Sequence, residues 1–224
     1  MKLHSNKGFT LVEIAIVLVI VGLLIGGVLK GQEMITNAKL KRIESDNAGI
    51  AAAMFSYQDR YLQLPGDDSG AAGRFDVYAP ADPVDGNGGG TVDGLWDVAA
   101  TGNITTDQTD ETNMFFAHLR AAGLVPGGGT DDTKPSNAYG GQIGIQDGSL
   151  LIAGHVTIFG QIEGPIARII EARLDDGNPD TGRVQAALVG AAADDSMASV
   201  APGEHPLDGV NYSDSVRYNM AFRL

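Results

Sequence analysis

Near its N-terminus the chain reads FTLVEIAIVLVIVGLLIGGVL, from Phe9 to Leu29, an apolar run with a single charged residue, Glu13. At a rise of about 1.5 Å per residue, a helix of this length spans roughly 30 Å, the thickness of the hydrocarbon core of a bilayer. Lys2 and Lys7 precede the run in a short basic leader. Because positive charge is retained on the cytoplasmic side, we expect a cytoplasmic leader, 1–8, and an exported remainder.

The apolar run is expected to be retained as a membrane segment, because no cleavage site of small residues follows it. Its Glu13 is costly in lipid. One interpretation is a glutamate tolerated near the interface, and the other is a carboxylate whose cationic partner arrives only on assembly. Cleavage after Gly8 would create a new ammonium group on Phe9, and the Phe9 of a second subunit could then neutralise Glu13.

The stretch KGFTLVE, residues 7–13, resembles the leader and cleavage motif of type IV prepilins and type II secretion pseudopilins. The resemblance implies cleavage between Gly8 and Phe9 by a prepilin peptidase, N-methylation of Phe9 and assembly through Glu13. It also implies four kinds of partner: homotypic or heterotypic pilin subunits, the peptidase and N-methyltransferase, an inner-membrane assembly platform, and the lipid bilayer before assembly.

A long helix is predicted from Phe9 to about Leu62, because no proline occurs before Pro65. Its membrane half, 9–29, is followed by an amphipathic half, 30–62, with an apolar stripe at helical spacing. The stripe comprises Leu40, Ile43, Ile50, Met54, Tyr57 and Tyr61. It predicts packing against a β-sheet, the arrangement that the pilin resemblance also implies. The sequence LPGDD, residues 64–68, should end the helix.

The remainder, 63–224, is predicted to form an acidic globular head with long glycine-rich loops. Two further helices are expected within it, at 111–123 and at 163–174, where a proline is tolerated in the first turn.

The strands of the head are predicted from alternation and turn residues. Segments 142–145 and 150–153 flank an Asp-Gly turn at 146–149 and indicate a hairpin. The alternating residues 216–224 predict a half-buried strand. The expected fold is therefore α+β and pilin-like, with the long helix packed on a small antiparallel sheet.

Composition excludes several functional classes. The chain has 15 basic and 28 acidic residues, a net charge of −13 and no cysteine. This balance argues against nucleic-acid binding, and the absence of cysteine excludes disulfides, cysteine-based zinc sites and thiol nucleophiles. Motifs of serine hydrolases, phosphate loops and zinc proteases are absent from the sequence, and no carboxylate pair stands out. We expect no enzyme, and a structural role for His118.

Two acidic loops are candidates for calcium. The first, 85–90, begins like a calcium loop but has Trp96 where a bidentate glutamate is required. The second offers four oxygen-bearing side chains within six residues: Asp175, Asp176, Asn178 and Asp180. Some pseudopilins bind calcium in a loop of the head, although the resemblance does not assign ligands here. The same residue types also favour a solvated turn for conformational reasons alone.

The function predicted from these observations is that of a structural prepilin subunit of a type IV pilus or a type II secretion pseudopilus. It would span the inner membrane once, with its head exported, and then enter a periplasmic pseudopilus or a cell-surface pilus. The alternative is a monomeric, membrane-anchored, exported binding module with calcium-binding loops, which would retain Met1 and never polymerise.

Overall fold

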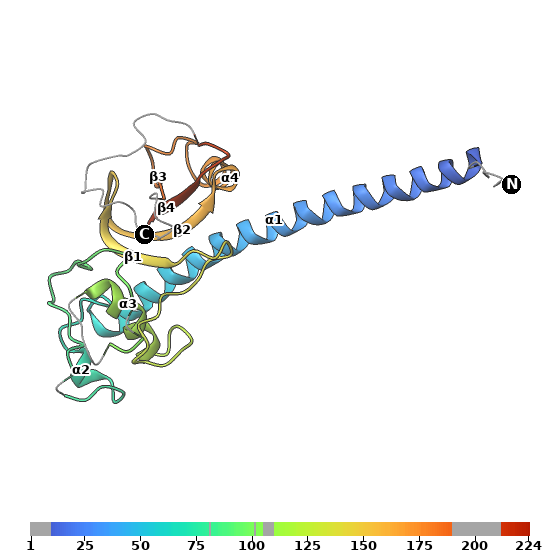
Figure 1. The fold of residues 1–224 in the computed structure, drawn as a ribbon. Helices are drawn as coiled ribbons and strands as arrows, with labels where there is room; N and C mark the ends of the chain where they lie inside the picture. Colours follow the sequence, from blue (N-terminus) through green and yellow to red (C-terminus); the bar gives the residue numbers. More distant parts are fainter. Residues whose placement is uncertain (1–9, 81, 101, 105–109, 190–211) are drawn as a thin grey trace, which may run out of the picture. The chain divides into compact units, whose positions relative to one another are not determined.

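The computed structural model describes residues 10–80, 82–100, 102–104, 110–189 and 212–224. Helix α1, Leu11–Tyr61, is a single uninterrupted α-helix, as predicted (Figure 1). The chain divides into two compact units, residues 1–41 and 42–224, and the division falls within α1. The second unit therefore contains the C-terminal part of α1 together with the whole head.

Helix α1 ends where the sequence predicts. The amide of Leu62 still donates to the carbonyl of Gln58 at 2.8 Å, but Leu62 itself adopts a left-handed backbone conformation with φ 57°. Pro65 and Gly66 follow, and Gly66 has φ 93°. A left-handed residue followed by proline cannot continue the helix, so the chain turns away at this point.

The head contains one four-stranded antiparallel sheet in the order β1-β2-β4-β3 (Figure 1). Its strands are β1, Ile143–Ser149; β2, Ile152–Glu163; β3, Val184–Leu188; and β4, Arg217–Arg223. Its helices are α2, Ala71–Arg74; α3, Glu111–Ala121; and α4, Gly164–Leu174. The α+β fold class is confirmed, as are helices at the two places predicted in the head.

One face of the sheet packs against the amphipathic part of α1. Thr157 of β2 pairs with Phe222 of β4, and its hydroxyl donates to Asn47 of α1. Phe159 lies on the same face, with its ring centroid 5.2 Å from that of Phe222. Ile43 of α1 is also buried. The polar Asn47 interrupts the apolar stripe of the helix because it bonds to the sheet.

Further along α1 the stripe contacts helices and loops rather than the sheet. Tyr57 is fully buried and stacks on His118 of α3, with ring centroids 6.3 Å apart. Tyr57 also lies near Phe75, at 6.2 Å. The prediction that the stripe packs on a sheet is therefore correct for the part of α1 around Asn47. It is wrong for the last turns of α1, where the partners of Tyr57 are Phe75 and His118.

The opposite face of the sheet is covered by Trp96. This side chain is 1% exposed and belongs to one apolar cluster with residues of three strands and of the turn between β1 and β2. The other members are Leu150, Ile152, Val156, Ile158, Ala187 and Ala221. Because β4 lies inside the sheet and both of its faces are covered, Asn219 and Ala221 are fully buried. The prediction of a half-buried final strand is therefore wrong.

The β1–β2 hairpin turns later than predicted. The Asp-Gly pair lies within β1, where the pairing register shifts between Asp147 and Ser149, and Gly148 has φ 66°. The chain reverses at Leu150, which has φ 56° and is 1% exposed. Between the pairs formed by Asp147 and by Ser149, β2 has one residue more than β1, so the predicted turn is replaced by an irregularity in the strand pairing. The burial of Leu150 in the Trp96 cluster offsets its unfavourable backbone conformation.

Candidate functional site

The first half of α1 has the surface of a membrane helix. It contains a segment apolar and long enough to cross a bilayer, and that segment is unburied in the structure. Large apolar side chains from Leu11 to Leu29 are 43–85% exposed. Such an exposed apolar surface needs lipid or other helices around it.

Glu13 lies in the first turn of this helix and forms a capping box with Thr10. Its Oε2 accepts hydrogen bonds from the backbone amide and from the hydroxyl of Thr10, both at 2.8 Å. In return, the amide of Glu13 donates to the Thr10 hydroxyl at 3.3 Å. The carboxylate is therefore held at the N-terminal end of α1, four residues from Phe9. Gly8 and Phe9, the predicted cleavage site, lie outside the described residues.

A second arrangement of carboxylates organises the glycine-rich loop 85–94. The two oxygens of Asp67 accept from the amides of Gly89 at 2.8 Å and Gly90 at 2.7 Å. Glu111 of α3 accepts from the amides of Asn87 and Asp93, each at 2.8 Å. Nothing in the spacing of the sequence indicates this role, because the donors lie 18 to 24 residues from their acceptors.

The loop that ends α1 is tied to α3 through His118. The amide of Gly66 donates to Nδ1 of His118 at 2.9 Å, and Nε2 donates to the carbonyl of Val84 at 2.9 Å. The ring is fully buried, and burial lowers the pKa of His118 to about 4. The neutral imidazole thus joins three segments of the head, as expected of a structural histidine.

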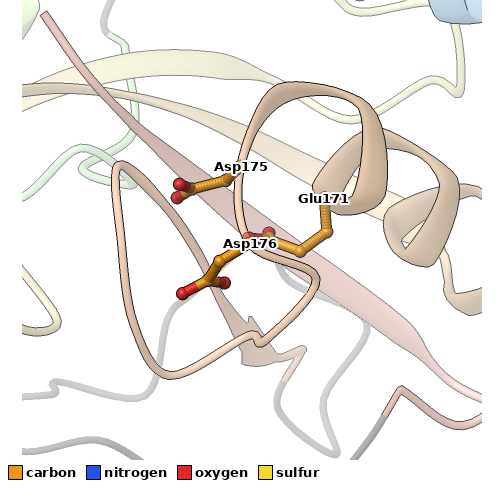
Figure 2. Close-up of side chains that lie close together, drawn as sticks. All are labelled: Glu171, Asp175 and Asp176. Carbon is orange, nitrogen blue, oxygen red and sulfur yellow. The ribbon is translucent and has the colours of Figure 1, made fainter.

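The acidic loop after α4 contains the only group of metal-capable side chains found within the described residues: Glu171, Asp175 and Asp176 (Figure 2). One carboxylate oxygen from each lies within 4.8 Å of the others. Figure 2 shows Glu171 extending from the last turns of α4 towards the two aspartates, which follow the helix.

Glu171 is fully buried, and its surroundings disfavour a negative charge. Its Oε2 accepts from the hydroxyl of Tyr212 at 3.0 Å, whereas Oε1 is buried without a hydrogen-bond partner among the described residues. Burial, with a contribution from the charges of Asp175 and Asp176, raises the pKa of Glu171 to about 8. In the sequence, the spacing of four between Glu171 and Asp175 is the one signal that places these carboxylates together.

The other two predicted ligands lie outside this group. Oδ1 of Asn178 accepts from the amide of Asp180 at 3.1 Å, a bond within the turn. The structure thus brings Asp175 and Asp176 together with Glu171, which was not predicted, and not with Asn178 and Asp180 in one metal-capable group.

Comparison with known proteins identifies the N-terminal segment. Residues 3–29 match the family described as the prokaryotic N-terminal methylation motif. This is the prepilin-type cleavage and methylation motif of type IV pilins and pseudopilins, and it includes Gly8, Phe9 and Glu13. No curated protein and no solved structure matches the chain. The motif and the apolar helix together support a type IV pilin-like or pseudopilin-like precursor.

Proposed function

We propose that this chain is a prepilin that is cleaved after Gly8, N-methylated on Phe9 and assembled into the helical filament of a type IV pilus or type II secretion pseudopilus. In this proposal Lys2 and Lys7 keep the leader in the cytoplasm while the acidic head is exported. The partners are the prepilin peptidase and N-methyltransferase, an inner-membrane assembly platform, and other pilin subunits.

The observation that carries the proposal is the methylation motif at residues 3–29, which includes the exposed apolar first half of α1. A soluble protein would bury such a helix. A pilin subunit places it in lipid before assembly and against the helices of its neighbours afterwards, so a continuous apolar surface is required at both stages.

Glu13 is the residue to which we assign recognition between subunits. Its bonds to Thr10 partly satisfy the carboxylate while the helix is in lipid, but they do not neutralise its charge. The ammonium group on Phe9 of a neighbouring subunit would do so, and in a dry environment that charge pair is strongly favoured over an unpaired carboxylate.

The processing step is tested by measuring the N-terminus and intact mass of the protein from the membranes and the sheared surface fraction of its own host. We expect a chain that begins at N-methylated Phe9. A chain that begins at Met1 in a host with active prepilin peptidase would refute the proposal.

The assembly step is tested with two substitutions of Glu13. Glu13→Ala removes both the charge and the cap, whereas Glu13→Gln removes the charge and retains an acceptor for the Thr10 amide. We expect both variants to be inserted and cleaved normally, and both to be depleted from sheared filaments or from a cross-linked pseudopilus. Glu33→Ala, which removes an exposed carboxylate paired with Lys30 on the same helix, is the matched control. Normal incorporation of Glu13→Gln would show that the charge has no role.

A further inference from the structure

We propose that a cleft at the C-terminal end of α1 binds a neutral saccharide. This inference goes beyond the proposed role in a filament and does not depend on it. The cleft has a volume of about 340 Å³ and is bordered by the end of α1, the glycine-rich loop 85–94 and strand β2. Its polar side chains include Gln58, Gln63 and His155, and its apolar ones are Leu62 and Leu64.

The observation that points to a ligand is the conformation of Leu62, compared with that of Leu150. Both leucines adopt a left-handed backbone conformation, with φ 57° and φ 56°, which is unfavourable for leucine. Leu150 is 1% exposed, so its burial offsets the strain, whereas Leu62 is 83% exposed and gains little from burial. Glycine or asparagine is the usual residue in this conformation after a helix. A strained backbone that displays an apolar side chain beside a cleft is typical of a functional site.

The polar side chains of the cleft are available to a ligand. Neither side-chain amide, of Gln58 or of Gln63, forms a hydrogen bond within the described part of the chain. Nδ1 of His155 is buried without a hydrogen bond to a described residue and lies 3.3 Å from Oδ1 of Asp147. Amides and neutral imidazoles both donate and accept hydrogen bonds, as hydroxyl groups do. These side chains are therefore suited to a ligand rich in hydroxyl groups.

The cleft offers no free charge to an ionic ligand. The carboxylate of Asp67 is buried, and its two oxygens already accept from the amides of Gly89 at 2.8 Å and Gly90 at 2.7 Å. Among the described residues that line the cleft, none is lysine or arginine. Because a buried ion requires a partner of opposite charge, the site favours a neutral ligand.

The size and the apolar wall of the cleft agree with a sugar. Small-molecule sites have volumes of about 300–1,000 Å³, and this cleft lies at the lower end of that range. A sugar ring carries hydroxyl groups around its rim and C–H groups on its face. The hydroxyl groups would bond to Gln58, Gln63 and His155, and the C–H face would pack on Leu62.

The test uses the full chain in micelles of a phosphocholine detergent, because that detergent carries no sugar. Four neutral disaccharides are titrated one at a time: maltose, cellobiose, lactose and N,N′-diacetylchitobiose. Binding is measured by calorimetry and by saturation-transfer nuclear magnetic resonance. We expect at least one of them to bind at one site per chain, with a Kd between about 10⁻⁴ and 10⁻² M.

Substitutions separate binding from folding. Glycine is favoured in the left-handed conformation, so Leu62→Gly should unfold at the same temperature as the wild type or higher, and yet bind at least fivefold more weakly. Gln58→Ala, at an exposed position of α1, should also weaken binding at least fivefold. Gln32→Ala, at an exposed position of the same helix outside the cleft, is the matched control and should bind as the wild type.

Two results in solution would overturn the proposal: failure of all four disaccharides to bind the wild type, or unchanged binding by Leu62→Gly and Gln58→Ala. In cells, a photoreactive amino acid at position 62 that cross-links to a polypeptide would assign the cleft to a protein partner, and would overturn the proposal as well. These outcomes are independent of N-terminal processing and of the Glu13 substitutions, so failure here is distinguishable from failure of the proposed function.

Discussion

Protonation of His118 should destabilise the head in mild acid. In the folded protein the ring must remain neutral, because its Nδ1 accepts from the amide of Gly66 while Nε2 donates to Val84. A protonated ring would lose the first of these bonds and would place a charge in a fully buried position. Substitution by glutamine, which does not titrate, isolates this effect.

The magnitude follows from the difference in pKa. Burial lowers the pKa of His118 from 6.5 to about 4, so between these values the unfolded chain binds a proton that the folded chain does not. The contribution of the neutral His118 to the free energy of unfolding is therefore fully present above pH 6.5 and is lost as the pH falls towards 4. Integration from pH 7 to pH 5 gives a loss of about 2 kcal/mol in the free energy of unfolding of the wild type from this group.

The assay is urea denaturation of the full processed protein in micelles at pH 7 and pH 5, with near-ultraviolet circular dichroism of Trp96 to verify the fold. The loss of unfolding free energy caused by His118→Gln should be about 2 kcal/mol smaller at pH 5 than at pH 7. The reason is that at pH 5 the wild type has already lost the contribution of the neutral His118. Comparing the two proteins at each pH cancels the contributions of the carboxylates. Thr157→Val, which removes no titratable group, should cost the same at both values. An equal cost of His118→Gln at pH 5 and pH 7 would refute the reasoning.

Three further substitutions test the packing of α1 and of the loop that follows it, each by urea denaturation under the same conditions. Gly66→Ala should lower the free energy of unfolding by about 2–4 kcal/mol. Gly66 has φ 93°, and a Cβ there would lie 2.5 Å from the carbonyl oxygen of Glu111. A loss below about 1 kcal/mol would contradict this expectation. Gly49→Ala should instead stabilise the protein by about 0.5–1 kcal/mol. The position is helical and exposed, and no atom lies within 4 Å of the added Cβ. Any destabilisation would count against a regular helix at this position. Thr157→Val removes the bond to Asn47 between the sheet and α1 and should cost about 1–3 kcal/mol; a neutral result would mean that this bond does not contribute to their packing.

Local features of the sequence were sufficient to predict α1, α3 and α4, but not the short helix α2. The apolar run from Phe9, the absence of proline before Pro65 and the helix-ending Pro-Gly pair predict α1 to within two residues at either end. Such elements depend on propensity, period and termination signals, which are local properties. The methylation motif is likewise a matter of residue order, and it was recognisable without any structure.

The strands were predicted less well, because their environment depends on distant segments. Both faces of β4 are buried because the Trp96 cluster covers one of them. On the other face, Phe222 lies beside Thr157 of β2, which bonds to Asn47 of α1. The turn at Leu150 likewise depends on its burial in the Trp96 cluster. Alternation predicts a strand, but it does not show what will be packed against each side.

The basic leader, the cleavage motif, Glu13 and the apolar helix depend on the order of residues along the chain, and they could be recognised without a structure. Tertiary structure decided which carboxylates are buried and which distant amides they bind. Asp67 accepts from amides 22 and 23 residues away. Glu171 is buried on α4 together with Ile170, and its carboxylate lies beside those of Asp175 and Asp176. A carboxylate has the same formal charge wherever it occurs, but its role depends on burial and on neighbouring donors, which arise only when the chain has folded.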